Sequence, residues 1–175
     1  MCWCAARSAR ACNTFRKTCK MRVFTIFSDG ACSGNPGPAG IGVHITENGV
    51  VVREVSEAIG QATNNIAEYR AFIRGLQEAK TLGAEHVQLR TDSQLLYFQL
   101  KGDYKVKHPN MKPLYEEAMA LLKNFRKVEC KVVPREENAQ ADRLATSALK
   151  KDKGSSHDGR PDVFFIGEES PSSRG

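Results

Sequence analysis

The stretch SDGACSGNPGPAG, residues 28–40, directly follows an apolar run from Val23 to Phe27. It contains a single acid, Asp29, and the eleven residues after that acid include four glycines and two prolines. The apolar run predicts a strand over 22–28, and the glycines and prolines predict a turn after it. We therefore expect one carboxylate at the end of a buried strand, beside a flexible turn.

The segments that follow alternate between strand and helix patterns. Strands are expected at 40–46 and 50–57, joined by Asn48-Gly49, a dipeptide typical of tight hairpins. Apolar residues then recur at helical spacing over 63–82, and Asn64 or Asn65 can cap the start of this helix while Gly83 can end it. The apolar face of the helix comprises Ile66, Tyr69, Phe72, Ile73, Leu76 and Ala79.

The second half of the chain predicts a strand over 86–92, helices over 93–102 and 109–125, a strand over 128–134 and a helix over 137–151. Hairpin-joined strands are antiparallel, whereas strands separated by a helix can be parallel. The expected fold is therefore an α/β fold, a five-stranded mixed sheet with helices on both faces. The strands 22–28 and 86–91 are expected to be parallel neighbours.

Acids follow both of these strands, and two more fall near helix starts. Asp29 and Asp92 lie at the carboxyl ends of the two strands, where ligands gather in open α/β sheets. Glu68 and Asp142 lie in the early turns of their helices. Together the four carboxylates would suit two Mg²⁺ or Mn²⁺ ions, the arrangement used for phosphodiester cleavage. Taken singly, each acid also fits a solvated or helix-terminal charge.

The ends of the chain differ in composition from the middle. Residues 1–20 carry five basic groups, no acid and four of the six cysteines, at spacings that match no usual zinc finger. We expect 1–20 to be a disordered leader, 21–150 to be the folded domain, and the Gly/Ser/Pro-rich 151–175 to be a disordered tail. No apolar run approaches the roughly 20 residues that cross a membrane. The cysteine pattern favours a reducing, cytoplasmic setting.

Four motifs occur in order: FSDGACSGNPGPAGIG, TNNIAEYRA, LRTDSQLL and PREENAQADRLA. Over residues 22–150 the chain resembles the ribonuclease H family, type 1. The resemblance implies a five-stranded mixed sheet and cleavage of the RNA strand of RNA–DNA hybrids, leaving 5′-phosphate and 3′-hydroxyl ends. It also implies that Asp29, Glu68, Asp92 and Asp142 bind two Mg²⁺ ions, with Mn²⁺ as a substitute, in a monomeric enzyme.

The resemblance also implies substrate contacts. The residues that match family contacts to the hybrid are Asn35, Thr63, Asn64, Asn65 and Gln94. Side-chain amides suit a ribose 2′-hydroxyl, which both donates and accepts. Alternatively, Asn64 and Asn65 only cap their helix. A short basic segment containing Lys105 and Lys107 stands where some relatives have a long basic protrusion, and it reads either as a phosphate contact or as a solvated loop.

One departure concerns the loop before the last acid, where many relatives carry a His. Here Arg135 is the basic residue at that position, as in a subset of bacterial and archaeal members. An Arg is not a general base near neutral pH, but it can hold a phosphate or stabilise a leaving oxygen. Two alternatives stay open: a nuclease that also cuts double-stranded RNA, and a non-catalytic nucleic-acid-binding module of the same fold.

Overall fold

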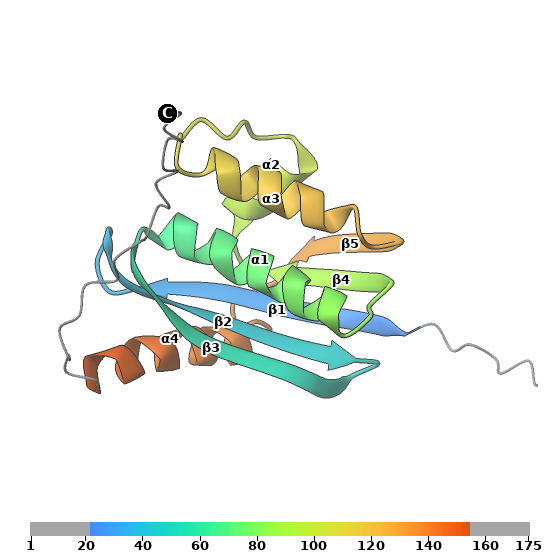
Figure 1. Ribbon diagram of the computed structural model, residues 1–175, viewed down its shortest axis with the longest axis horizontal. Helices are drawn as coiled ribbons and strands as arrows, with labels where there is room; N and C mark the ends of the chain where they lie inside the picture. The colour runs from blue at the N-terminus through green and yellow to red at the C-terminus, as the bar shows by residue number, and fades with distance from the viewer. Residues whose placement is uncertain (1–21, 155–175) are drawn as a thin grey trace, which may run out of the picture.

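The computed structural model describes residues 22–154, with side chains as far as residue 151. Its sheet has the strand order β3-β2-β1-β4-β5 (Figure 1). The strands are β1 Val23–Cys32, β2 Gly37–Glu47, β3 Val50–Ala62, β4 His86–Thr91 and β5 Lys127–Val132, and the helices are α1 Asn64–Thr81, α2 Gln94–Lys101, α3 Lys112–Leu122 and α4 Ala139–Gly154. The predicted leader, and the predicted tail beyond residue 154, lie outside the described residues.

Pairing within the sheet is mixed. β1 is antiparallel to β2 and β2 to β3, whereas β1 is parallel to β4 and β4 to β5. The tight hairpin between β2 and β3 turns at Asn48 and Gly49, whose φ angles are 49° and 87°. Positive φ at both positions is the geometry that favours this dipeptide. The predicted mixed sheet, the hairpin and the adjacency of the first and fourth strands are confirmed.

Helices α1 and α4 cover opposite faces of the sheet (Figure 1). Glycines allow both to approach closely. A Cβ atom on Gly30 of β1 would lie 2.3 Å from the carbonyl carbon of Ala67 in α1, and one on Gly42 of β2 would lie 2.0 Å from the carbonyl oxygen of Ala141 in α4. Gly42 is the cross-strand partner of Asp29, so these two residues face the same side of the sheet. Gly30 follows Asp29 and therefore faces the other side, because successive residues of a strand alternate.

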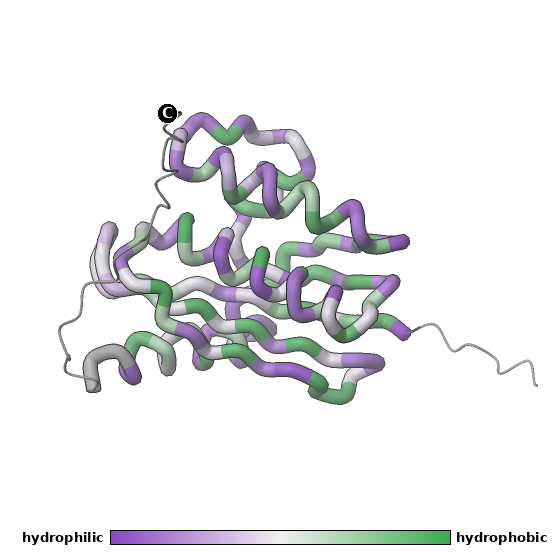
Figure 2. Tube along the Cα trace, in the orientation of Figure 1, coloured by the Kyte–Doolittle hydropathy of each residue, from purple (hydrophilic) through white to green (hydrophobic). Residues whose placement is uncertain are grey.

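The main hydrophobic core lies between α1 and the sheet. Phe24 and Ile26 of β1 pack there with the buried α1 residues Tyr69, Phe72 and Leu76. Figure 2 shows the corresponding alternation of hydrophobic and hydrophilic residues along the strands. The hydroxyl of Tyr69 donates to Oε1 of Gln99 at 2.7 Å, which satisfies a buried polar pair and ties α2 to α1.

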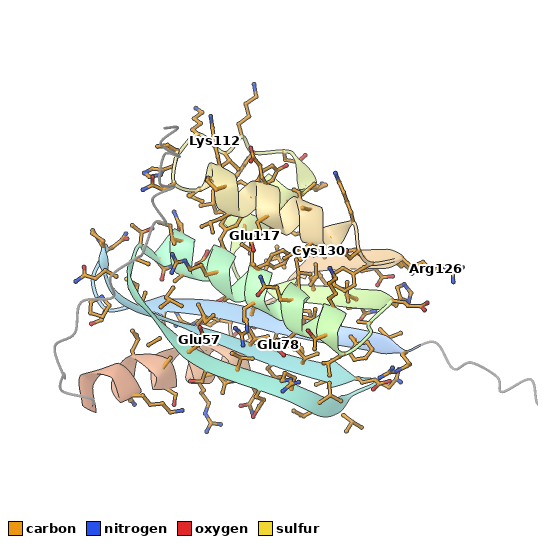
Figure 3. All side chains as sticks on the ribbon, viewed as in Figure 1. Glu57, Glu78, Lys112, Glu117, Arg126 and Cys130 are labelled. Atoms are coloured by element: carbon orange, nitrogen blue, oxygen red, sulfur yellow. The ribbon has the colours of Figure 1, made fainter. Side chains whose placement is uncertain are left out.

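Charged side chains join α1 to its neighbours at the surface. Arg74 of α1 pairs with Glu57 of β3 at 3.3 Å and with Glu78 of its own helix at 3.0 Å. On the other side of α1, the amide of Gln77 donates to Glu117 of α3 at 3.3 Å. Figure 3 labels the three glutamates. Each exposed pair of this kind adds about 1 kcal/mol or less to the stability of the fold. Packing of the core therefore contributes more to stability than these pairs do.

Several boundaries differ from the expected ones: β3 continues to Ala62 instead of ending at 57, and α4 spans Ala139–Gly154 instead of 137–151. The N-cap of α1 is Thr63, whose Oγ1 accepts from the backbone N–H of Ile66, so the prediction that Asn64 or Asn65 caps this helix is wrong. Helix α3 begins at Lys112, not at 109, with a proline in its first turn, where the missing N–H has no consequence. Within residues 22–154, no helix combines the length and hydrophobicity needed to span a bilayer.

Candidate active site

Asp29 lies on the face of the sheet that α4 covers, and only 9% of its surface is exposed. The residue after it, Gly30, faces α1, where a Cβ atom would lie 2.4 Å from the backbone nitrogen of Glu68. The absence of a side chain at Gly30 therefore brings the start of α1, and Glu68 with it, close to Asp29. The prediction that the strand ends at 28 and that a turn follows directly is wrong: β1 continues to Cys32, and Gly30 is paired with Ile41 inside it. At this position a glycine is needed for the close approach of α1, not for a turn.

Glu68 is held by two donors. The amide of Asn64 donates to Oε1 at 2.9 Å, and the hydroxyl of Ser93, the N-cap of α2, donates to Oε2. Burial raises the pKa of Glu68 above its usual value, and the negative charge of Asp92 raises it further, whereas the two hydrogen bonds act in the opposite direction. Glu68 is therefore already oriented toward the end of β4.

Asp92 lies between β4 and α2, at the carboxyl end of the strand that pairs with β1. Its Oδ1 accepts from the side-chain amide of Asn138 at 3.0 Å. Asn138 directly precedes α4, and the same amide reaches the backbone carbonyl of Ser28 in β1 at 3.1 Å. The side chain of Asn138 thus connects β1 and the end of β4 with the start of the last helix.

Asp142 lies in the first turn of α4. Its Oδ1 accepts from the guanidinium of Arg135 at 2.7 Å, and 75% of the Arg135 side chain is exposed. This bond raises the pKa of Arg135 above its usual value, with Asp142 as the largest cause. Arg135 therefore stays protonated, and it provides a positive charge at the rim of the acid cluster.

The four acids share one electrostatic field. The pKa of Asp29 is raised to about 7, chiefly because its carboxyl group is buried. The negative charges of Asp92, Asp142 and Glu68 raise it further, and the positive charge of Arg135 lowers it. Asp29 and Asp142 are 113 positions apart in the sequence, and their charges thus interact at one edge of the sheet.

As they stand, no three His, Cys, Asp or Glu side chains among residues 22–154 lie close enough together to hold one metal ion. Glu68, Asp92 and Asp142 are instead each engaged by a neighbouring donor. The donor set is nevertheless all carboxylate oxygen around a buried acid with a raised pKa. Mg²⁺ and Mn²⁺ prefer oxygen ligands and offset such charge, so the donor set fits them once side chains such as Asp142 rotate away from their present partners.

The residues predicted to contact substrate beside α1 lie together. The backbone N–H of Asn64 donates to Oδ1 of Asn35 at 3.4 Å, which connects the turn after β1 with the start of α1. Thr63 is half-buried as the helix cap, whereas Asn64 and Asn65 are exposed. Because Asn64 also donates to Glu68, this polar segment is continuous with the acid cluster.

The remaining predicted contacts lie around α2. Gln94 is exposed at the first position of α2 and lines a surface hollow with Tyr97, Phe98, Lys131 and Val132. Lys105 and Lys107 are exposed in the segment between α2 and α3. Within the described part of the chain neither lysine forms a salt bridge, in contrast to Lys101, which pairs with Asp103. Both ammonium groups are therefore available to a polyanion.

Comparison with known proteins identifies the family. A family model described as "Reverse transcriptase-like" matches residues 27–148. The "Bifunctional protein Rv2228c" of Mycobacterium tuberculosis is 43% identical over 152 residues, which cover 86% of this chain and 42% of that protein. The crystal structure of RNase H1 from Halobacterium salinarum is 39% identical with a TM-score of 0.72, and the match covers 74% of this chain and 98% of that one. The chain belongs to the ribonuclease H family, type 1.

A further structural relative of this chain is LC11-RNase H1, solved in complex with an RNA/DNA hybrid. It is 40% identical with a TM-score of 0.70, and the match covers 74% of this chain and 99% of that one. The chain spans about two fifths of the length of the mycobacterial relative. Its matches to the two RNase H1 structures, by contrast, cover 98% and 99% of those chains.

Two residues that hold the acids were not predicted as site residues. Ser93 caps α2 by accepting from the backbone N–H of Leu96, and it also donates to Glu68. Asn138 was not singled out at all. Its spacing of four residues from Asp142 places the two on one side of a helix start, and this spacing is the signal in the sequence that points to it.

Proposed function

We propose that this ribonuclease H is a metal-dependent endoribonuclease that hydrolyses the RNA strand of RNA–DNA hybrids and leaves 5′-phosphate and 3′-hydroxyl ends. The observation that carries the proposal is the shared field of four carboxylates, in which the pKa of Asp29 is raised to about 7. Buried like charges are unfavourable unless a cation offsets them. The hybrid as substrate is supported by the solved complex of the similar LC11-RNase H1.

Asp29, Glu68, Asp92 and Asp142 would hold two Mg²⁺ ions, and Mn²⁺ would be able to replace them. When bound, such ions supply an activated water and stabilise the leaving oxygen of an in-line displacement. The chain itself contributes the positions of the ligands. Asn64 and Ser93 orient Glu68, while Asp29 must lose its proton before it can bind a cation.

Arg135 has a supporting role in this proposal. Its raised pKa excludes it as a proton acceptor. Its exposed guanidinium lies at the rim of the cluster, 2.7 Å from Asp142, where a phosphate of the substrate would pass. A guanidinium binds phosphate oxygens through two parallel hydrogen bonds, so Arg135 is suited to hold the cleaved phosphate or to stabilise its leaving oxygen.

The amide side chains define the expected path of the hybrid. Asn35, Asn64 and Asn65, with Thr63, would contact the nucleic-acid backbone beside α1, and Gln94 would read the minor groove. An amide can accept from a ribose 2′-hydroxyl and also donate to it, which distinguishes RNA from DNA. Lys105 and Lys107 would add salt-sensitive phosphate contacts.

The proposed setting is a monomer in the cytoplasm. Among residues 22–154, Cys32 and Cys130 form no disulfide with each other. At the rim of the acid cluster, 31% of the Asp142 side chain is exposed. The mass of the purified protein in solution checks the monomeric state.

End-labelled RNA–DNA hybrid, RNA duplex and DNA duplex, each incubated with Mg²⁺ or Mn²⁺, test the proposed activity. The expected result is cleavage of the RNA strand of the hybrid with 5′-phosphate ends, no cleavage after chelation, and none by the Asp92→Asn variant. Cleavage of RNA duplex as well would broaden the substrate class. Binding of the hybrid without cleavage would instead identify a non-catalytic module and overturn the proposal.

A further inference from the structure

Asn138 is the most deeply buried polar side chain near the acid cluster. It directly precedes α4, and only 1% of its surface is exposed, compared with 9% for Asp29. A buried amide is unfavourable unless its hydrogen-bonding groups are used. The partners of Asn138 therefore indicate what its burial achieves.

The side-chain amide of Asn138 donates two hydrogen bonds, one to β1 and one to Asp92. Nδ2 donates to the backbone carbonyl of Ser28 at 3.1 Å and to Oδ1 of Asp92 at 3.0 Å. A carbonyl and a carboxylate oxygen only accept, so the orientation of the amide is determined by its partners. Asn138 thus acts as a donor toward two different strands.

An Asn in front of a helix usually serves that helix, because its side-chain oxygen accepts from a backbone N–H in the first turn. Asn138 does not. Its Oδ1 has no hydrogen-bond partner among the described residues, although the atom is buried. The amide instead donates to Ser28 of β1 and to Asp92 after β4. Its oxygen does not cap α4.

The bonds of Asn138 reach the surroundings of three acids. Ser28 precedes Asp29 on β1, and Asp92 is bonded directly. The backbone N–H of Asp142 donates to the backbone carbonyl of Asn138 at 3.1 Å. Asn138 therefore fixes β1, the end of β4 and the first turn of α4 relative to one another.

We propose that Asn138 is a positioning residue that fixes the Asp92 carboxylate relative to β1 and the first turn of α4, so that divalent cations can be bound once side chains such as Asp142 rotate. This inference rests on the proposed function. The amide is neutral, so it orients Asp92 without offsetting its charge, whereas the guanidinium of Arg135 does offset charge at Asp142. Outer partners of metal ligands typically change metal affinity or activity by about 10- to 100-fold when they are removed.

The test uses Asn138→Leu, which removes both donors at similar size, and Asn138→Ala, which removes the amide without adding a charge. Asn124→Leu is the matched control, because Asn124 is also an amide that donates to two backbone carbonyls, those of Ala120 and Leu121, but is exposed at the end of α3. Mn²⁺ affinity is measured by calorimetry without substrate, and the Mg²⁺ concentration for half-maximal hybrid cleavage is measured separately. Thermal unfolding with chelator defines a temperature at which every variant is folded.

Both Asn138 variants are expected to bind Mn²⁺ about 10- to 100-fold more weakly at that temperature and to need correspondingly more Mg²⁺, with the control unchanged. If either folded variant retains Mn²⁺ affinity within about twofold of the wild type, the positioning role is wrong. The positioning role is also wrong if Mn²⁺ affinity falls only in samples that are partly unfolded. If the wild-type protein binds Mn²⁺ but leaves hybrid intact, the proposed function fails while the calorimetry still decides the role of Asn138.

Discussion

Arg135 donates a hydrogen bond to Asp142 across 2.7 Å, so an exposed cation of the chain is paired with one of the four clustered acids. Its charge also lowers the pKa of Asp29, against the larger effects of burial and of the neighbouring acids. Arg135 therefore already does part of what a metal ion would do at this edge of the sheet. The same guanidinium is exposed enough to turn toward a phosphate.

Replacement of Arg135 by Ala is expected to slow turnover of hybrid by about 10- to 1,000-fold without abolishing it, because one charge-stabilising donor is lost while the ligands remain. Steady-state cleavage of labelled hybrid measures the effect. Arg126→Ala is the control, since Arg126 is exposed next to the start of β5, at the opposite end of the sheet (Figure 3). Unchanged turnover in Arg135→Ala would remove this residue from the mechanism.

The raised pKa of Asp29 predicts how the stability of the metal-free protein depends on pH. Its folded-state value of about 7 exceeds the ordinary value of 3.8, so between these pH values the folded protein keeps a proton that the unfolded chain has released. Stability is therefore expected to fall as the pH rises from about 4 to about 7 and then to level off. Urea unfolding in the presence of chelator measures this slope.

The Asp29→Asn variant should lose that part of the slope and, at pH 8, should be more stable than the metal-free wild type by on the order of 1–3 kcal/mol. Asp103→Asn is the control, because Asp103 is exposed and paired with Lys101 outside the cluster. Equal slopes for wild type and Asp29→Asn would show that Asp29 is not the buried, charge-crowded acid described above.

Lys105 and Lys107 are expected to contribute affinity for hybrid rather than catalysis. In the inactive Asp92→Asn background, each substitution by Ala should weaken hybrid binding and reduce the slope of log affinity against log salt by about one. Lys127→Ala is the control, because Lys127 pairs with Glu129 at the start of β5. An unaltered salt slope in both loop variants would identify the segment as a solvated loop.

Much of the fold could be predicted because local signals agreed with it. Asn48-Gly49 predicted the hairpin and has the positive φ angles that such a turn needs. The intervening helix predicted parallel pairing of β1 with β4, and this pairing in turn brought Asp29 and Asp92 to one edge. The sequence order of strands and helices was therefore enough to predict where the acids gather.

The detailed bonding of the site could not be predicted, because it depends on side chains that compete for partners across the fold. Thr63, Asn64 and Asn65 can all cap a helix, and Thr63 does so while Asn64 donates to Glu68 instead. Asn138 has the position of a helix cap, yet its amide bonds to Ser28, 110 residues earlier. No local pattern encodes such a contact.

The central claim is that the four acids bind divalent cations, and diffraction from crystals soaked in Mn²⁺ at pH 8 tests it most directly. We predict two anomalous peaks about 3.5–4 Å apart, bounded by carboxylate oxygens of Asp29, Glu68, Asp92 and Asp142, with Arg135 turned away from Asp142. Peaks elsewhere, or no peaks while Arg135 still pairs with Asp142, would contradict the account.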